Sequence, residues 1–136
     1  MQDSEIRKVL ERHWYYAGKD EAISNEMYDE DAVLEFPQSG ERFRGRANFQ
    51  VWRDRYPASL TIEIRRLRGA GGFWVAENLI TYEGEDTWQT ISILELREGK
   101  IVREAIYFTK PFPAPEWRSQ WVDRGPTDEA AGGSSA

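Results

Sequence analysis

The spacing of the hydrophobic residues changes at Pro57, and this change constrains the fold more than any other feature of the sequence. Before Pro57, apolar residues recur at helical spacing in three segments that begin near residues 4, 21 and 47. After it, four stretches rich in strand-forming residues are separated by the turn sequences GAGG, GED and REG, a pattern typical of an antiparallel meander. Helices first and strands afterwards predict an α+β domain in which three helices cover one face of a curved sheet.

The helical half of the chain contains recognisable start and stop signals. Asp3 or Ser4 can cap the first helix, and Asp20 can cap a short second helix. The acidic segment YDEDA, residues 28–32, is predicted to be the turn that follows. The apolar stretch AVLEF, residues 32–36, is then predicted to be a strand.

Length and composition exclude several classes of partner. A chain of 136 residues suits one domain, predicted here over residues 1–124, with a disordered Gly, Ser and Ala tail over residues 125–136. The 18 basic and 24 acidic side chains give a net charge of −6, which disfavours nucleic acid as a partner. The chain has no cysteine, no secretory signal and no apolar run near the roughly 20 residues that cross a bilayer. We therefore predict a cytoplasmic protein without a membrane partner.

Several stretches of the chain resemble the SnoaL-like branch of the NTF2-like superfamily. The resemblance covers residues 4 to about 122 and is carried by GKDEAI, YDEDAVLEFP, SGERFRGRANFQVW and ISILELREGKIVREAIYF. It implies the NTF2-like (cystatin-like) conical barrel, in which a bent antiparallel sheet wraps around three helices and leaves a pocket open at one end. It also implies a homodimer formed through the outer, convex face of the sheet.

The active sites known in this superfamily do not transfer to the chain. The proton-shuttling Asp of ketosteroid isomerases falls on Phe36 here, and the acid that helps hold the enolate oxygen falls on Ser92. Their tyrosine falls on Arg12 or His13, and the second histidine of scytalone dehydratases is missing. The Asp base of SnoaL-type cyclases and the Asp-Arg-Asp set of limonene epoxide hydrolases have no counterpart. The RDR sequence at residues 53–55 is predicted to be solvated charge on a helix.

The two-residue period of a strand predicts which side chains face the pocket. With Ser92 placed inward, Ile91 and Ile93 face outward, onto a convex surface that needs a cover. The pocket is then mainly apolar and aromatic, as small-molecule sites usually are. Its predicted ligand-binding residues are Trp14, Leu34, Phe36, Trp52, Asn78, Ile80, Trp88, Thr90, Ser92, Ile106 and Phe108.

Glu104 is the leading candidate for a catalytic residue. An inward carboxyl in an apolar pocket has its charged form disfavoured by desolvation, which suits it to general acid–base chemistry. The structural alternative is an ion pair with an arginine at the rim, namely Arg12, Arg42 or Arg44. A register error of one residue would instead place Glu104 in solvent.

His13 and Tyr82 complete the predicted catalytic set. His13 either forms a proton-relay pair with Glu104 or bonds to a backbone group at the edge of the core. Tyr82, together with Asn78 or Ser92, would orient a carbonyl or hydroxyl group. A single histidine and scattered carboxylates give no ligand cluster, so we predict no metal and no other cofactor.

Three functions of different classes follow from this pocket and the resemblance. The first is an isomerase, cyclase or dehydratase type of enzyme that acts on a small apolar polyketide-, terpenoid- or steroid-like molecule. The second is a non-catalytic pocket that binds such a molecule. The third is an association module that uses the convex face while its own side chains fill the cone.

The segment PFPAPEWRSQWV, residues 111–122, ends the ordered part of the predicted domain. Its prolines turn the chain away from the sheet, and Trp117 and Trp121 lie four residues apart, on one face of a short helix. These tryptophans are predicted to cover the open end of the cone or to pack on a partner. The RRLR run at residues 65–68 is predicted to be a solvent-facing part of a strand, with an anion site as the alternative.

Overall fold

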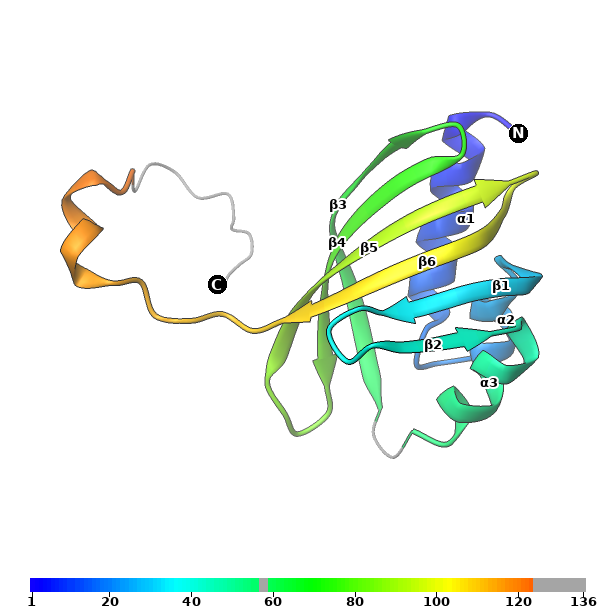
Figure 1. The fold of residues 1–136 in the computed structure, drawn as a ribbon, viewed down its shortest axis with the longest axis horizontal. Helices are drawn as coiled ribbons and strands as arrows, with labels where there is room; N and C mark the ends of the chain where they lie inside the picture. The colour runs from blue at the N-terminus through cyan, green and yellow to red at the C-terminus, as the bar shows by residue number, and fades with distance from the viewer. Residues whose placement is uncertain (57–58, 124–136) are drawn as a thin grey trace.

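The computed structural model describes residues 1–56 and 59–123, so the predicted disordered tail lies outside the described residues. The elements in chain order are α1 (Asp3–Tyr16), α2 (Glu21–Asn25), β1 (Tyr28–Phe36), β2 (Glu41–Arg44), α3 (Arg46–Asp54), β3 (Leu60–Ala70), β4 (Phe73–Tyr82), β5 (Thr87–Arg97), β6 (Lys100–Thr109) and the 3-10 helix η1 (Glu116–Trp121). The strands form one sheet in the order β2-β1-β6-β5-β4-β3 (Figure 1).

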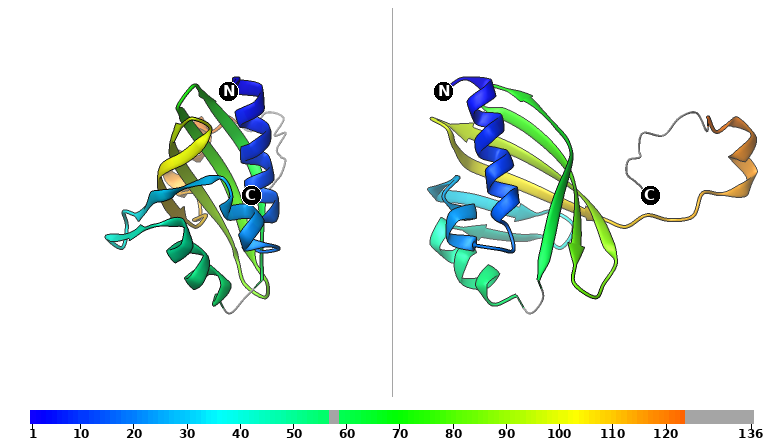
Figure 2. Two further views of the ribbon diagram at one scale, coloured as in Figure 1. Left: turned by 90° about the vertical axis from the view of Figure 1, so that its right-hand side faces the viewer. Right: turned by 180° about the vertical axis from the view of Figure 1, so that it is seen from behind.

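The predicted α+β class and the curved sheet are confirmed. Strands β3 to β6 pair consecutively and antiparallel, and the sheet bends around the helices without closing (Figure 2). One pairing departs from the antiparallel pattern, because β1 lies parallel to β6. This pairing attaches the helical half of the chain to the meander.

The prediction of a turn at residues 28–32 is wrong, since these residues belong to β1. The register against β6 shifts between Tyr28 and Val33, so a bulge interrupts the strand. Within the bulge Glu30 and Asp31 are exposed, whereas Tyr28 is fully buried. The acidic residues of this segment resemble a turn sequence because the bulge exposes them to solvent while the strand continues.

Both N-terminal helices are capped locally, although one cap differs from the prediction. Asp20 caps α2 as predicted, with its Oδ1 atom accepting a hydrogen bond from the Ile23 amide at 3.1 Å. Helix α1 already includes Asp3, and Gln2 precedes it as the cap. The Glu5 carboxylate accepts a hydrogen bond from the Gln2 amide at 2.8 Å, which satisfies a donor that the first turn leaves free.

The hydrophobic core fills one half of the cone. The apolar stripe of α1, which includes Leu10 and Trp14, packs against buried side chains of the sheet such as Trp74 and Leu94. These residues belong to the half of the sheet where α1 begins and where β4 starts. The other half, towards the ends of α1 and β4, is not filled in this way and holds the cavity described below.

The chain leaves the sheet after β6 and runs away from the body of the domain (Figures 1 and 2). The predicted short helix in this segment is present as η1, a 3-10 helix. The predicted arrangement in which its tryptophans cover the cone is not adopted, because Trp117 and Trp121 are exposed. None of the described helices is long and apolar enough to cross a membrane.

The contact between the end of α1 and the start of β3 requires a glycine. Gly18 has a φ angle of +81°, and a Cβ atom there would lie 2.4 Å from the Leu60 carbonyl oxygen. We expect G18A to be clearly more destabilising than G40A. Gly40 also has a positive φ, +76°, but its Cβ would meet nothing within 4 Å, so G40A isolates the backbone cost of roughly 1–2 kcal/mol.

Urea unfolding of the two variants and the wild type at one pH measures this difference. Equal losses of unfolding free energy in G18A and G40A would show that the close approach of Gly18 to Leu60 does not affect stability.

Candidate functional site

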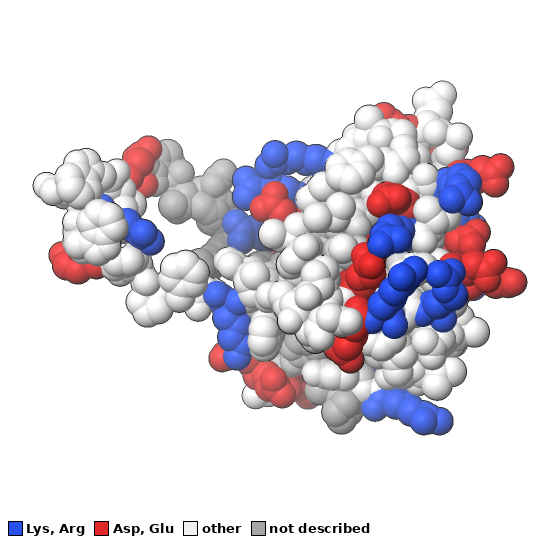
Figure 3. Space-filling view, viewed as in Figure 1, with Lys and Arg blue, Asp and Glu red and all other residues white. Residues whose placement is uncertain are grey.

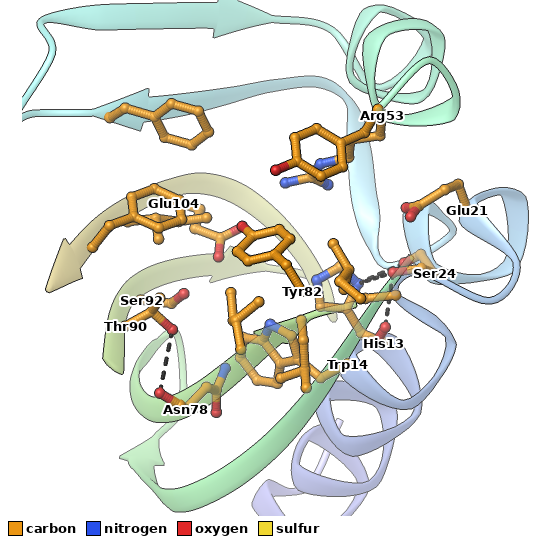
Figure 4. A pocket seen from close by; sticks show the side chains of 18 of the residues that line it. His13, Trp14, Glu21, Ser24, Arg53, Asn78, Tyr82, Thr90, Ser92 and Glu104 are labelled. Atoms are coloured by element: carbon orange, nitrogen blue, oxygen red, sulfur yellow. Dashed lines mark hydrogen bonds between the residues drawn. The ribbon is translucent and has the colours of Figure 1, made fainter. Parts of the chain in front are cut away.

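A cavity of about 210 Å³ lies between the concave face of the sheet and the helices. Figure 4 shows polar side chains of the sheet, among them Asn78, Ser92 and Glu104, facing His13 of α1 and Arg53 of α3. The predicted residues that line the cavity are His13, Trp14, Phe36, Trp52, Asn78, Ile80, Tyr82, Thr90, Ser92, Glu104, Ile106 and Phe108.

Two predicted lining residues lie elsewhere. Leu34 is completely buried in the hydrophobic core, beside Glu104 in the β1–β6 register, and does not reach the cavity. Trp88 is half-buried near the start of β5, where the Lys110 amine lies 4.5 Å from its ring centre. Alternation along a strand predicts the inner face correctly, but it does not say which inner residues are covered by other parts of the core.

Glu104 is buried, with 1% of its surface exposed, and its carboxylate is held by Tyr28. The Tyr28 hydroxyl donates to Oε1 of Glu104 at 2.5 Å. Burial, ahead of the opposing effect of Arg53, raises the pKa of Tyr28, so its hydroxyl stays protonated and remains a donor. No other described residue donates to Glu104, which leaves its second oxygen, Oε2, available to a ligand.

Arg53 supplies the positive charge that compensates Glu104, and it does so through Tyr28. Its Nη1 atom donates to the Tyr28 hydroxyl at 3.3 Å and to Oδ1 of Asn25 at 3.2 Å. The guanidinium also lies over the Tyr28 ring, 5.5 Å from its centre. A buried carboxylate is costly unless hydrogen bonds and a counter-charge accompany it. Arg53, and not the predicted rim arginines Arg12, Arg42 or Arg44, meets that need.

Tyr28 and Arg53 line the cavity beside Glu104, although the sequence patterns predict neither of them there. Tyr28 was assigned to a turn, and no local pattern marks the bulge that keeps it in the sheet. Arg53 was assigned to solvent, although a signal was present, because it lies four residues after the buried Phe49 on the same side of α3. The long Arg53 side chain extends inward along the side of α3 that carries Phe49.

His13 bonds to the backbone, in agreement with the second of its two predicted roles. Its Nδ1 atom lies 2.6 Å from the Ser24 carbonyl oxygen, which can only accept, so Nδ1 carries the hydrogen. The Ser24 hydroxyl donates in return to the His13 carbonyl at 2.8 Å. Burial lowers the pKa of His13 despite the opposing charge of Glu104, which makes the ring neutral near pH 7 and leaves Nε2 as an acceptor.

Two further polar groups in the cavity wall lack a partner. Oδ1 of Asn78 and Nε1 of Trp52 are buried and bond to no described residue. Buried polar atoms of native proteins normally have a partner, so these two atoms are exceptions beside the cavity. Burial also raises the pKa of the nearby Tyr82, which keeps its hydroxyl protonated at neutral pH.

No metal site accompanies this polar set in the part of the chain that the structure describes. No three His, Asp or Glu side chains there are grouped closely enough to hold a metal ion. The cavity wall offers the carboxylates of Glu21 and Glu104, the Arg53 guanidinium, hydroxyl groups and the neutral imidazole of His13 in mainly apolar surroundings.

Comparison with known structures places this architecture among NTF2-like proteins. An NTF-2 like protein of unknown function from Burkholderia xenovorans LB400 is 44% identical, with a TM-score of 0.84, and the match covers 91% of this chain and 98% of that one. A proposed ketosteroid isomerase from Kribbella flavida DSM 17836 has a TM-score of 0.80 at 23% identity, over 94% and 96% of the two chains.

A more distant structure shares the fold alone. The LEH-like epoxide hydrolase of M. tuberculosis has a TM-score of 0.67 at 17% identity, over 77% of this chain and 83% of that one. No curated protein matches the chain. The family of the SnoaL-like domain, in contrast, matches residues 9–104, which are most of the chain. The chain therefore belongs to the SnoaL-like domain family, within the NTF2-like superfamily.

Proposed function

We propose that the protein is an enzyme that moves a proton on a small, mainly apolar molecule carrying a carbonyl or hydroxyl group, with Glu104 as the acid–base residue. The observation that supports this most is the state of Glu104. It is buried at the wall of an apolar cavity, Tyr28 holds one of its oxygens, and no described residue donates to the other. A carboxylate oriented in this way can accept a proton from a bound molecule.

The proposed step needs no cofactor, because its proton and electrons balance within the substrate. Oε2 of Glu104 removes a proton from the carbon next to a carbonyl. The electron pair of that C–H bond forms a C=C bond, and the π electrons of the carbonyl move onto its oxygen to give an enolate. The protonated Glu104 then returns the proton to another carbon of the same molecule. Hydroxyl donors of the wall, such as those of Tyr82 and Ser92, are available to the developing oxyanion.

The polar neighbours of Glu104 keep it competent for this role. His13 is uncharged, so it forms no ion pair with Glu104, whereas a protonated imidazolium would. Arg53 lies beyond Tyr28, so the carboxylate is compensated without a direct ion pair that would block its second oxygen. Tyr28 also fixes the orientation of the carboxylate, which reduces the reorganisation needed for proton transfer.

The alternative is a pocket that binds such a molecule without changing it. The hydrogen bonds around Glu104 also support this binding function. Tyr28 and Arg53 already compensate much of the buried charge of Glu104, so its burial is explained without catalysis. The names of the more distant structures do not decide between the two functions, because similarity at this level shows the fold only. They do suggest which compounds to assay first, namely ketones and epoxides.

We expect E104Q to abolish turnover while leaving ligand binding largely intact. Glutamine keeps the shape and polarity of the side chain but cannot serve as the base, so kcat/KM should fall about 100-fold or more. The assay follows β,γ-unsaturated ketones of increasing size, whose isomerisation to conjugated ketones changes the ultraviolet absorbance. Native mass spectrometry of the purified protein, carried out in parallel, identifies any ligand that it retains.

The matched control is E95Q, which makes the same change at an exposed position of β5. Turnover by E104Q at the wild-type rate would refute the catalytic role of Glu104. A retained ligand together with no turnover of any compound by the wild type would favour the binding function.

We expect His13 to titrate below its ordinary value of 6.5, because burial lowers its pKa. Between the folded and unfolded pKa values the unfolded chain binds more protons, so the contribution of His13 to stability is complete above pH 6.5 and is lost as the pH falls below it. The chain has one histidine, so its ring proton gives a single NMR signal to follow.

Urea unfolding between pH 5 and pH 8 tests the second half of this prediction. H13N is the control, since the asparagine amide can still donate to the Ser24 carbonyl but does not titrate. The loss of stability towards low pH should be smaller in H13N than in the wild type. A His13 pKa at or above 6.5 would contradict the prediction.

A further inference from the structure

The segment after β6 exposes large aromatic side chains that none of the other described residues covers. We call residues 110–122 the C-terminal arm. Phe112 is 80% exposed, Trp117 73% and Trp121 70%. Figure 1 and the right-hand view of Figure 2 show that the arm extends away from the helices and the sheet.

An arm of this kind is not stable by itself in water. Its helix η1 has six residues, far fewer than the roughly 12–15 that an isolated helix needs to be even marginally stable. Hydrogen bonds within η1 are local, such as the bond from the Val122 amide to the Ser119 carbonyl at 3.2 Å. Exposed tryptophans at this density are typical of surfaces that bind a partner.

The outer face of the sheet offers a hollow of about 240 Å³ close to the root of the arm. Leu79, Gln89 and Thr109 lie side by side across β4, β5 and β6. The wall also includes Ile91, Arg65 and the ion pair of Arg66 with Glu77. Arg65 is the extra residue of a bulge in β3 and forms no ion pair in the described part of the chain. Figure 3 shows uncharged surface over the middle of this face, with many of the charged side chains gathered over β1 and β2.

We propose that two copies of this chain exchange their C-terminal arms, so that Trp117 and Trp121 of each copy fill the outer hollow of the other. The indole rings would cover Leu79 and Ile91, and the Arg65 guanidinium can stack on an indole face. Charge is complementary as well, because Glu116 begins η1 and would meet the unpaired Arg65. Each copy supplies both an arm and a hollow, which suits a two-fold dimer.

The occupant is a second copy because the arm's own hollow is out of its reach. Thr109, the last residue of β6, directly precedes the arm and also lines the hollow. Pro111, Pro113 and Pro115 favour an extended chain, which advances about 3.1 Å per residue and carries Trp117 roughly 25 Å from Thr109. A second copy placed against the outer face meets the arm at that distance.

Cysteine cross-linking tests the exchange directly, because the chain contains no cysteine of its own. The full-length double variant Q120C/Q89C places one thiol in the arm and one at the hollow. Treatment with a short bis-maleimide should give a covalent dimer. The control Q120C/K8C, whose second thiol lies on α1, should give no more dimer than Q120C alone. A cross-link within a single chain, or no cross-link above the control, would overturn the proposal.

Sedimentation analysis provides an independent readout. We expect W117A/W121A to weaken dimerisation at least 100-fold, while F73A, which removes an exposed aromatic at the far end of β4, changes it by less than about threefold. Both changes are at exposed positions, and circular dichroism verifies that the fold is retained. A W117A/W121A variant that dimerises as tightly as the wild type, or a wild type that is monomeric at 100 micromolar, would overturn the exchange.

Mixing provides the sharpest distinction between exchange and docking within one chain. W117A/W121A has a defective arm and an intact hollow, whereas R65E/I91D has an intact arm and a defective hollow. Neither should dimerise alone, yet their mixture should form a heterodimer, because one intact arm then meets one intact hollow. Failure of the mixture to associate would refute reciprocal exchange.

Discussion

The parallel pairing of β1 with β6 is the interaction on which the rest of the structure depends. Through it the helical half of the chain is fastened to the meander, which would otherwise be a four-stranded sheet with one face uncovered. The same pairing sets Glu104 opposite Leu34 and directs both inward. Because a bulge precedes this register, Tyr28 also remains in the sheet and comes within hydrogen-bond distance of Glu104. This one pairing thus joins β1 and β2 to the meander in one sheet and assembles the polar site around Glu104.

The network of Glu104, Tyr28 and Arg53 is polar, whereas most of the interior is apolar. Most of the buried side chains are apolar, and a carboxylate among them is stable only with donors and a counter-charge. Tyr28 and Arg53 provide these from β1 and α3, so three separate elements must be correctly packed before Glu104 can be buried. Natural domains depart from simple packing rules chiefly at functional sites, and this network is such a departure. The network places charged and hydrogen-bonding groups in a cavity wall that is otherwise mainly apolar.

The two faces of the sheet have different tasks in this arrangement. The concave face lines the cavity, and its strands contribute polar side chains such as Asn78, Ser92 and Glu104 to the cavity wall. The convex face presents Ile91 and Tyr107 in register on neighbouring strands, both partly exposed. An exposed apolar row beside an aromatic arm is consistent with assembly, and assembly would leave the cavity on the opposite face free for a ligand. The proposed site and the proposed interface therefore do not compete for the same surface.

The sequence by itself determined the elements that depend on neighbouring residues. Helical and strand periods, the Asp20 cap and the glycine turns specify three helices followed by a meander, and alternation around Ser92 predicts most of the residues that line the cavity. Resemblance to the SnoaL-like family supplied the conical arrangement, which local patterns do not contain.

Only the tertiary structure decided which inward side chains meet one another. Tyr28 and Glu104 are 76 residues apart, and the bulge and parallel register that join them have no local signature. Arg53 turned inward because its helix packs over Tyr28, while Leu34 and Trp88 fell outside the cavity for equally long-range reasons. Periodicity reports the face on which a side chain lies, whereas hydrogen bonds, buried charge and the path of the arm depend on where distant segments meet in space.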